Sequence, residues 1–193
     1  MNCSKFVVSF IILLFCLNLF AGPFGLEMGM SLEDIGGKSI KMSDGNYGFK
    51  ELPKSHSAFD LYLLQIAPKG GLYDIMAVGK FITCNPNGFQ LKKQFDDLKE
   101  TLGENYGKCL MVDTLSAGSI WDKPGDWMMG LSKKHRTYKA IWGEESFLPP
   151  DLKIITLEAY STSLGKGFIF LRYGFINSDS CSTEKSAEEN SAL

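Results

Sequence analysis

The sequence predicts an α+β fold in which an antiparallel sheet, built from two β-hairpins, has two main helices packed on it. Residues 60–83 and residues 152–175 each show two strand-like segments separated by a glycine-containing turn. Between them, residues 87–106 repeat apolar side chains at the spacing of one helix face. A chain of 193 residues has the length of one domain, so we expect these elements to share one core.

The first hairpin is predicted to pair residues 60–67 with residues 72–83. The first of these strands has apolar residues on both faces, which is typical of a strand inside a sheet. Proline fixes φ at the first position of the turn that starts at Pro68, and Gly70 and Gly71 accept positive φ. The chain is therefore expected to reverse direction there.

The helix predicted over residues 87–106 follows directly. Asn87 is expected to cap its N-terminus, and Gly103 or Gly107 to end it. Its charged residues occupy one side, so the other side needs an apolar surface, which the preceding hairpin supplies. The residues of this apolar stripe are Leu91, Phe95, Leu98 and Leu102.

The second half begins with a strand predicted over residues 110–115. Asp122 is expected to cap a second helix that has Pro124 in its first turn. A strand is predicted over residues 137–142, where side chains alternate between two faces, and it leads to the second hairpin. The return strand of that hairpin is apolar on both sides: Ile169, Leu171, Tyr173 and Phe175 lie on one, and Phe168 and Phe170, with Arg172, on the other.

The N-terminus has the features of a signal peptide. Lys5 precedes an apolar run over residues 6–16, and the segment ends with small residues. We predict cleavage after Ala21 and a secreted or periplasmic protein without a stable membrane span. Residues 13–16 have the outline of a lipobox, but Phe15 is too large for its position, which argues against a lipid on Cys16.

The sequence thus divides into three parts. Residues 1–21 are the predicted signal peptide, and residues 22–177 form a single α+β domain. Residues 178–193 are polar and rich in Ser and Glu, so a disordered tail is expected.

Residues 29–35 read Gly-Met-Ser-Leu-Glu-Asp-Ile, and Ser31 with Asp34 forms a predicted capping box. This pattern resembles the opening helix of small β-barrel-assembly lipoproteins and of the β-lactamase-inhibitor-protein fold. Together with residues 118–129 it also resembles a family of uncharacterised exported bacterial proteins. The first resemblance implies a role in envelope assembly; those lipoproteins have a good lipobox, from which this chain departs. The second implies export and no activity.

Composition excludes several function classes. The formal net charge is −2, whereas nucleic-acid binding favours a basic surface. Cys84, Cys109 and Cys181 would remain after cleavage, and with two histidines they lack the spacing of a metal site, so no metal or cofactor is predicted. We expect no Cys84–Cys109 disulfide, because about sixteen helical residues would hold the two ends about 24 Å apart. An intramolecular bond, if formed, would use Cys181.

The function predicted from these features is a non-enzymatic binding or assembly module of the bacterial envelope, with a protein partner in the envelope or medium. Tryptophan is enriched at interfaces. Trp121 and Asp122, in a loop, and Trp127 are the candidate binding residues, and Trp121 is expected to be more exposed than Trp127 and Trp142. The sequence assigns neither the partner nor an oligomeric state.

The alternative is a secreted hydrolase that uses Cys84, or a serine, with His56 or His135. Cys84 precedes a predicted helix, and a helix N-terminus lowers the pKa of a thiol. This hypothesis requires the nucleophile to lie within hydrogen-bond reach of a histidine. No complete catalytic constellation is visible in the sequence, so no catalytic residue is assigned.

Overall fold

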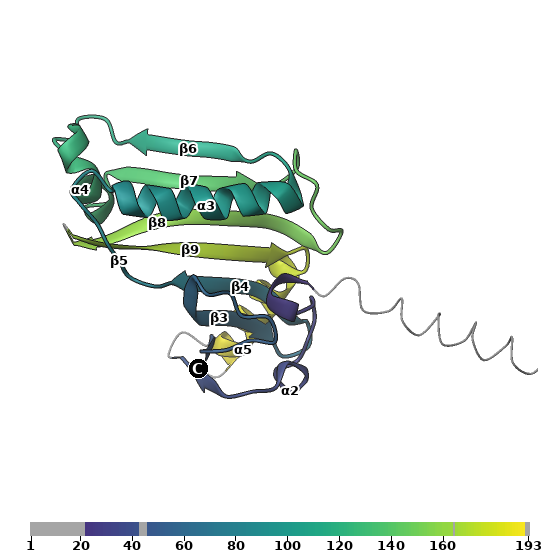
Figure 1. Ribbon diagram of the computed structural model, residues 1–193. Helices are drawn as coiled ribbons and strands as arrows, with labels where there is room; N and C mark the ends of the chain where they lie inside the picture. Colours follow the sequence, from purple (N-terminus) through teal and green to yellow (C-terminus); the bar gives the residue numbers. More distant parts are fainter. Residues whose placement is uncertain (1–21, 43–45, 164, 192–193) are drawn as a thin grey trace, which may run out of the picture.

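The computed structural model describes residues 22–42, 46–163 and 165–191, and the predicted signal peptide with Cys16 lies outside them. The described residues form one antiparallel sheet of nine strands in the order β1-β2-β3-β4-β9-β8-β7-β6, with β5 also paired to β9 (Figure 1). The predicted α+β class is confirmed. The strands are β1 (Ser39–Lys41), β2 (Tyr47–Phe49), β3 (Phe59–Ala67), β4 (Gly71–Gly79), β5 (Ile82–Thr83), β6 (Leu110–Leu115), β7 (Arg136–Trp142), β8 (Leu152–Ser163) and β9 (Lys166–Phe175).

Both predicted hairpins are present, and they meet in the centre of the sheet. β3 pairs with β4, β8 pairs with β9, and the contact between β4 and β9 places Ile75 opposite Tyr173 and Ala77 opposite Leu171. All four of these side chains are buried. Because side chains alternate along a strand, they point to one side of the sheet, which we call the core face.

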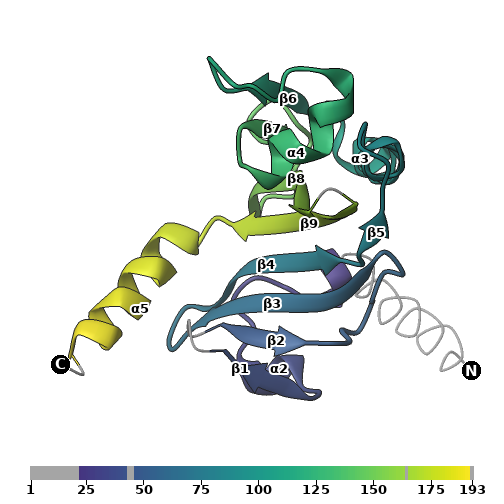
Figure 2. The same cartoon turned by 90° about the vertical axis from the view of Figure 1, so that its left-hand side faces the viewer.

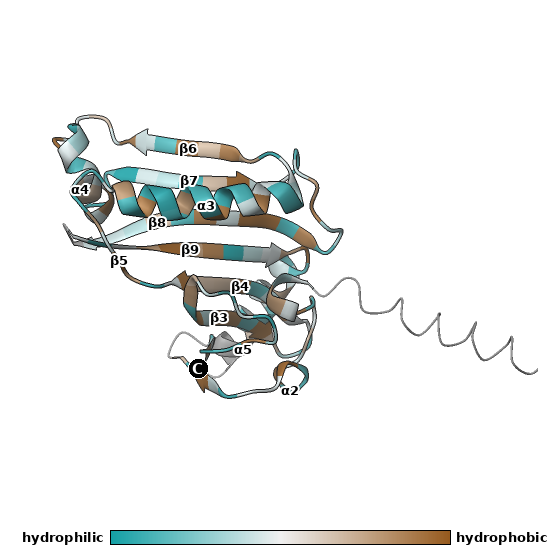
Figure 3. Cartoon of the chain, viewed as in Figure 1, coloured by the Kyte–Doolittle hydropathy of each residue, from teal (hydrophilic) through white to brown (hydrophobic). Residues whose placement is uncertain are grey.

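Helix α3 (Phe89–Tyr106) covers the core face over β8 and β9, and its four predicted stripe residues are all buried. Helix α4 (Trp127–Ser132) lies beside it over β7 and β8 and adds Met128 and Leu131 to the same core. Figure 3 shows teal and brown alternating along α3, as expected for an amphipathic helix. Burying each large apolar side chain contributes roughly 1.5–3 kcal/mol before conformational entropy is subtracted.

The N-terminal segment, residues 22–36, covers the core face beside β3 and β4. It contains the 3₁₀ turn η2 (Pro23–Gly25) and helix α2 (Leu32–Ile35), and the predicted capping box of α2 is present. The ring of Phe24 makes edge contacts with Tyr62 and Tyr173 at centroid distances of 4.9 and 5.7 Å. Phe24 holds a left-handed backbone conformation, with φ 56°, which these ring contacts help to maintain.

Two helix starts differ from the prediction. Asn87 does not cap α3; the Oδ1 of Asn85, which precedes the N-cap position, accepts a hydrogen bond from the Phe89 N–H at 3.0 Å. Gly88 stands at the N-cap position with φ 68°, where a side chain would collide with the ring of Trp127. Asp122 caps no helix, because the 3₁₀ turn η3 (Pro124–Asp126) comes first and α4 begins at Trp127.

The predicted disordered tail is a helix, α5 (Ser178–Ser191), in the described residues. Cys181 is buried against Ala67 and Tyr73. The Glu184 carboxylate accepts hydrogen bonds from the backbone N–H groups of Lys69 and Gly70, at 2.7 and 3.3 Å. The prediction rested on composition alone, and these contacts with the β3–β4 turn correct it.

Candidate functional site

The structure separates the predicted binding residues, because Trp127 belongs to the core. Only 4% of Trp127 is exposed. The Nζ atom of Lys92 lies 4.3 Å from the centre of its ring, and the ring of Tyr138 meets it edge to face at 5.4 Å. Trp127 therefore joins α3, α4 and β7, and it is not available to a partner.

Trp121 is half-buried and Asp122 is exposed, whereas Trp127 and Trp142 are buried. The prediction that Trp121 is the most exposed tryptophan is thus confirmed. The loop also exposes Ile120, of which 74% is accessible. Trp121 and Asp122 thus remain at the surface of this loop, whereas Trp127 does not.

Cys84 lacks the environment of a reactive thiol. It is buried, and its Sγ lies 3.3 Å from the carbonyl oxygen of Ile82, to which it donates. Burial raises the pKa of Cys84, so the thiol is protonated at neutral pH and is a poor nucleophile. The predicted lowering of its pKa by the helix N-terminus is therefore wrong.

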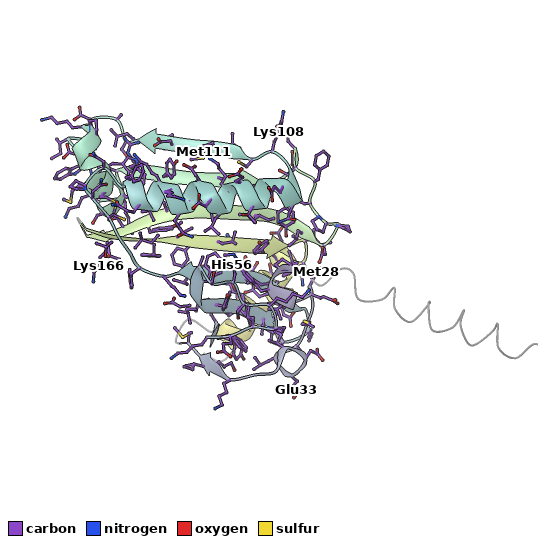
Figure 4. All side chains as sticks on the ribbon, viewed as in Figure 1. Met28, Glu33, His56, Lys108, Met111 and Lys166 are labelled. Atoms are coloured by element: carbon purple, nitrogen blue, oxygen red, sulfur yellow. The ribbon has the colours of Figure 1, made fainter. Side chains whose placement is uncertain are left out.

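The two histidines lie in different hydrogen-bond environments. Nδ1 of His56, on the loop before β3, accepts from the Ala58 N–H at 3.2 Å (Figure 4). Nδ1 of His135 lies 3.0 Å from the Oγ of Ser119. In the described chain no hydrogen bond joins Cys84 to either ring, and no carboxylate binds either ring. Ser119 and His135 thus form a pair without the third, orienting group of a triad.

An uncovered apolar surface lies on the side of the sheet opposite the core face, which we call the open face. Of the described helices only α5 packs on this side, and its sheet contacts are with β3 and β4. Figure 2 shows α3 to the right of β8 and β9 and α5 to the left. By strand pairing the open face contains Met76, Val78, Thr156, Glu158, Tyr160, Phe168, Phe170 and Arg172.

Four rings on this side form a continuous group that we call the aromatic cluster: Phe81, Tyr160, Phe168 and Phe170. Phe168 contacts each of the other three, at centroid distances of 5.6 Å to Phe81, 5.7 Å to Tyr160 and 5.2 Å to Phe170. Phe81 is 67% exposed and Tyr160 is 37% exposed. Burial and the neighbouring Glu158 raise the pKa of Tyr160 to about 12, so its hydroxyl is neutral at ordinary pH.

Beside the aromatic cluster, the open face contains an ion pair. The Nε of Arg172 donates to the Oδ2 of Asp74 at 2.7 Å, and Asp74 is buried. Burial raises the pKa of Asp74, and the Arg172 guanidinium opposes this shift. The pair lies between the rings and the end of the sheet where α5 packs, and it adds no net charge to the surface.

Sequence reasoning did not identify the open face as a site. The alternation of side chains places Phe168 and Phe170 on the second side of the return strand but does not show what covers them. The available signal was that this strand is apolar on both sides, while an amphipathic helix covers only one side.

The described residues contain no group of three His, Cys, Asp or Glu side chains that could hold a metal ion. Among the helices within this part of the chain, none is long and apolar enough to cross a membrane. Comparison with protein-family models, with curated proteins and with solved structures found no match. Function is therefore inferred from the surfaces of the molecule itself.

Proposed function

We propose that the protein is an exported, non-enzymatic binding module that contacts a protein partner in the bacterial envelope or medium through the open face. The aromatic cluster carries the proposal: four rings touch one another on a side of the sheet where the described helices leave them uncovered. Aromatic residues are enriched at protein interfaces because they bury a large area at low entropic cost.

The chemistry of the open face favours a protein over other macromolecules. Contiguous apolar patches bordered by polar groups mark interaction surfaces in soluble proteins. Glu158 and the Asp74–Arg172 pair border the aromatic cluster and can supply hydrogen bonds at the rim. With a formal net charge of −2, the chain lacks the basic balance that a nucleic acid would require.

Capture from the native envelope and medium fractions tests the proposal. Phe81→Glu places a charge in the aromatic cluster at a residue that is already 67% exposed, so the fold should be retained. We expect this variant to lose the partner that the wild-type protein captures, because a charge would have to be desolvated at the interface.

Phe89→Glu is the matched control. Phe89 is 65% exposed, but it lies at the start of α3 and outside the aromatic cluster. The control should capture the partner as the wild-type protein does. Equal capture by both variants, or equal loss in both, would contradict binding through the open face.

Export is the part of the proposal that rests on residues 1–21 alone. Intact-mass measurement of the protein recovered from the envelope or medium should give a chain that begins at Gly22. A mass that retains residues 1–21, or that includes a diacylglycerol on Cys16, would contradict this prediction.

A secreted hydrolase is the second candidate function, and the 3.0 Å contact between Ser119 and His135 is the observation that favours it. A serine activated by a histidine reacts with fluorophosphonate probes. Labelling that disappears in Ser119→Ala would favour the hydrolase. Absence of labelling, with partner capture intact, would leave the binding module as the assignment.

A further inference from the structure

A groove of about 800 Å³ lies on the core side of the molecule, away from the open face. The N-terminal segment, the C-terminal end of α3 and the start of β8 form its walls. Met28, which lines it, is labelled near the right-hand end of the sheet in Figure 4. A groove of this volume falls in the range of small-molecule sites.

Three aromatic rings line the groove: Phe24, Tyr106 and Tyr173. The ring of Tyr173 meets Phe24 and Tyr106 edge to face, at centroid distances of 5.7 and 6.3 Å. Tyr173 also shares a hydrogen bond with Tyr106, and burial raises the pKa of both hydroxyls. Both tyrosines are therefore neutral at physiological pH, so neither hydroxyl adds a charge to the groove.

The charged side chains that line the groove are both acidic. Gly22 also lines it, so after the predicted cleavage its α-amino group would bring one positive charge against two negative ones. Glu27 and Asp151 line it, no Lys, Arg or His does, and neither carboxylate has an ion-pair partner in the described residues. The C-terminal end of α3 reaches the groove at Asn105 and Tyr106, and its last turn contains no basic residue. Because a helix C-terminus has a partial negative charge, the end of α3 adds to the negative potential.

We propose that this groove binds an organic ammonium ligand, in which a positively charged nitrogen carries apolar substituents. The rings attract such a cation through their π faces, and the two carboxylates balance its charge. An anion would be repelled by both carboxylates. A neutral apolar ligand would displace water from the two carboxylates and would offer them neither a charge nor a hydrogen bond in return. The proposal does not depend on the open face, because the two surfaces use different residues.

Choline and 3,3-dimethylbutan-1-ol provide a direct test, since they have nearly the same shape and only choline is charged. Each is titrated into isotope-labelled protein recovered from the producing cell, with its N-terminus defined by intact mass, and amide chemical shifts are followed. We expect saturable binding of choline at the groove and binding of the alcohol at least about tenfold weaker. Equal affinities, or no saturable binding of choline, would overturn the proposal.

The double variant Glu27→Gln/Asp151→Asn removes both charges and preserves side-chain shape. It should weaken choline binding at least about tenfold and leave the affinity for the alcohol unchanged. Glu33→Gln/Asp60→Asn is the matched control at exposed positions outside the groove, and it should bind choline normally. Unchanged choline binding in the groove variant would exclude the site.

Phe81→Glu separates this proposal from the proposed function. It should abolish partner capture and leave choline binding intact, because Phe81 lies in the aromatic cluster and not in the groove. Loss of choline binding in Phe81→Glu would contradict a ligand site that is independent of the open face.

Discussion

Strand β9 places apolar side chains on both the core face and the open face, but the described helices cover only the first of these surfaces along β9. On the core face Ile169, Leu171 and Tyr173 are buried, with α3 packed over the strand. On the open face Phe168 and Phe170 are half-buried, and the rings around them shield only part of their surface. An apolar face of a strand is therefore not always buried by other parts of the protein. A remaining apolar surface is a candidate for a partner.

A mutation on the core face gives the strongest test of the difference between the two faces. Replacing Phe95 by Ala should cost on the order of 3–5 kcal/mol of folding free energy, because the side chain is fully inaccessible and its loss leaves a cavity. Urea denaturation measures the change. A loss below about 1 kcal/mol would mean that α3 does not hold the core face as described.

A substitution at Gly70 tests whether α5 packs over the edge of the open face. A side chain at this position would collide with Cys181, so Gly70→Ala should weaken the packing of α5 by about 1–3 kcal/mol. Hydrogen exchange of residues 178–187 should then increase. Gly103→Ala is the control: nothing lies near its added methyl group, and we expect stabilisation by about 0.5–1 kcal/mol. Unchanged exchange in Gly70→Ala would show that α5 does not pack as described.

A phenylalanine on the open face should respond differently from Phe95. Phe81→Ala removes a side chain that is 67% exposed, so the folding free energy should change by no more than about 0.5 kcal/mol. Partner capture should nevertheless weaken. A large drop in stability with unaltered capture would assign Phe81 to the fold and not to the interface.

The smallest expected effect concerns pH. Burial raises the pKa of Asp74 above its ordinary value of 3.8, so in the folded state its charged form is disfavoured. Its contribution to stability is therefore fully present below pH 3.8 and decreases as pH rises through the raised value. Asp74→Asn should remove this decrease from a plot of unfolding free energy against pH. If the variant shows the same pH dependence as the wild type, Asp74 does not cause the decrease in stability.

Much of the covered half of the molecule could be predicted from the sequence, because its signals are local. The spacing of Leu91, Phe95, Leu98 and Leu102 specifies one helix face, and the turns at Pro68 and Gly165 specify two hairpins. The local sequence favours Asn87 as the cap of α3, because nothing local shows that Trp127 packs against Gly88.

The remaining features depend on contacts between distant segments. The composition of residues 178–191 favours disorder, and the burial of Cys181 against Ala67 and Tyr73 is what holds them as a helix. Trp127 has the same residue type as an interface tryptophan, and only the packing of Lys92 and Tyr138 around it shows that it is a core residue. The groove and the open face likewise arise from topology, which a strand pattern does not specify.

Site-specific photo-crosslinking tests the central claim, binding of a protein partner through the open face, most directly. Tyr160 is replaced by p-benzoylphenylalanine on the open face, and Glu100, exposed on α3, is replaced in a matched sample. On illumination of producing cells we expect one discrete adduct from position 160, lost when Phe81→Glu is added, and none from position 100. Adducts of equal yield from both positions, or an adduct only from position 100, would contradict the account.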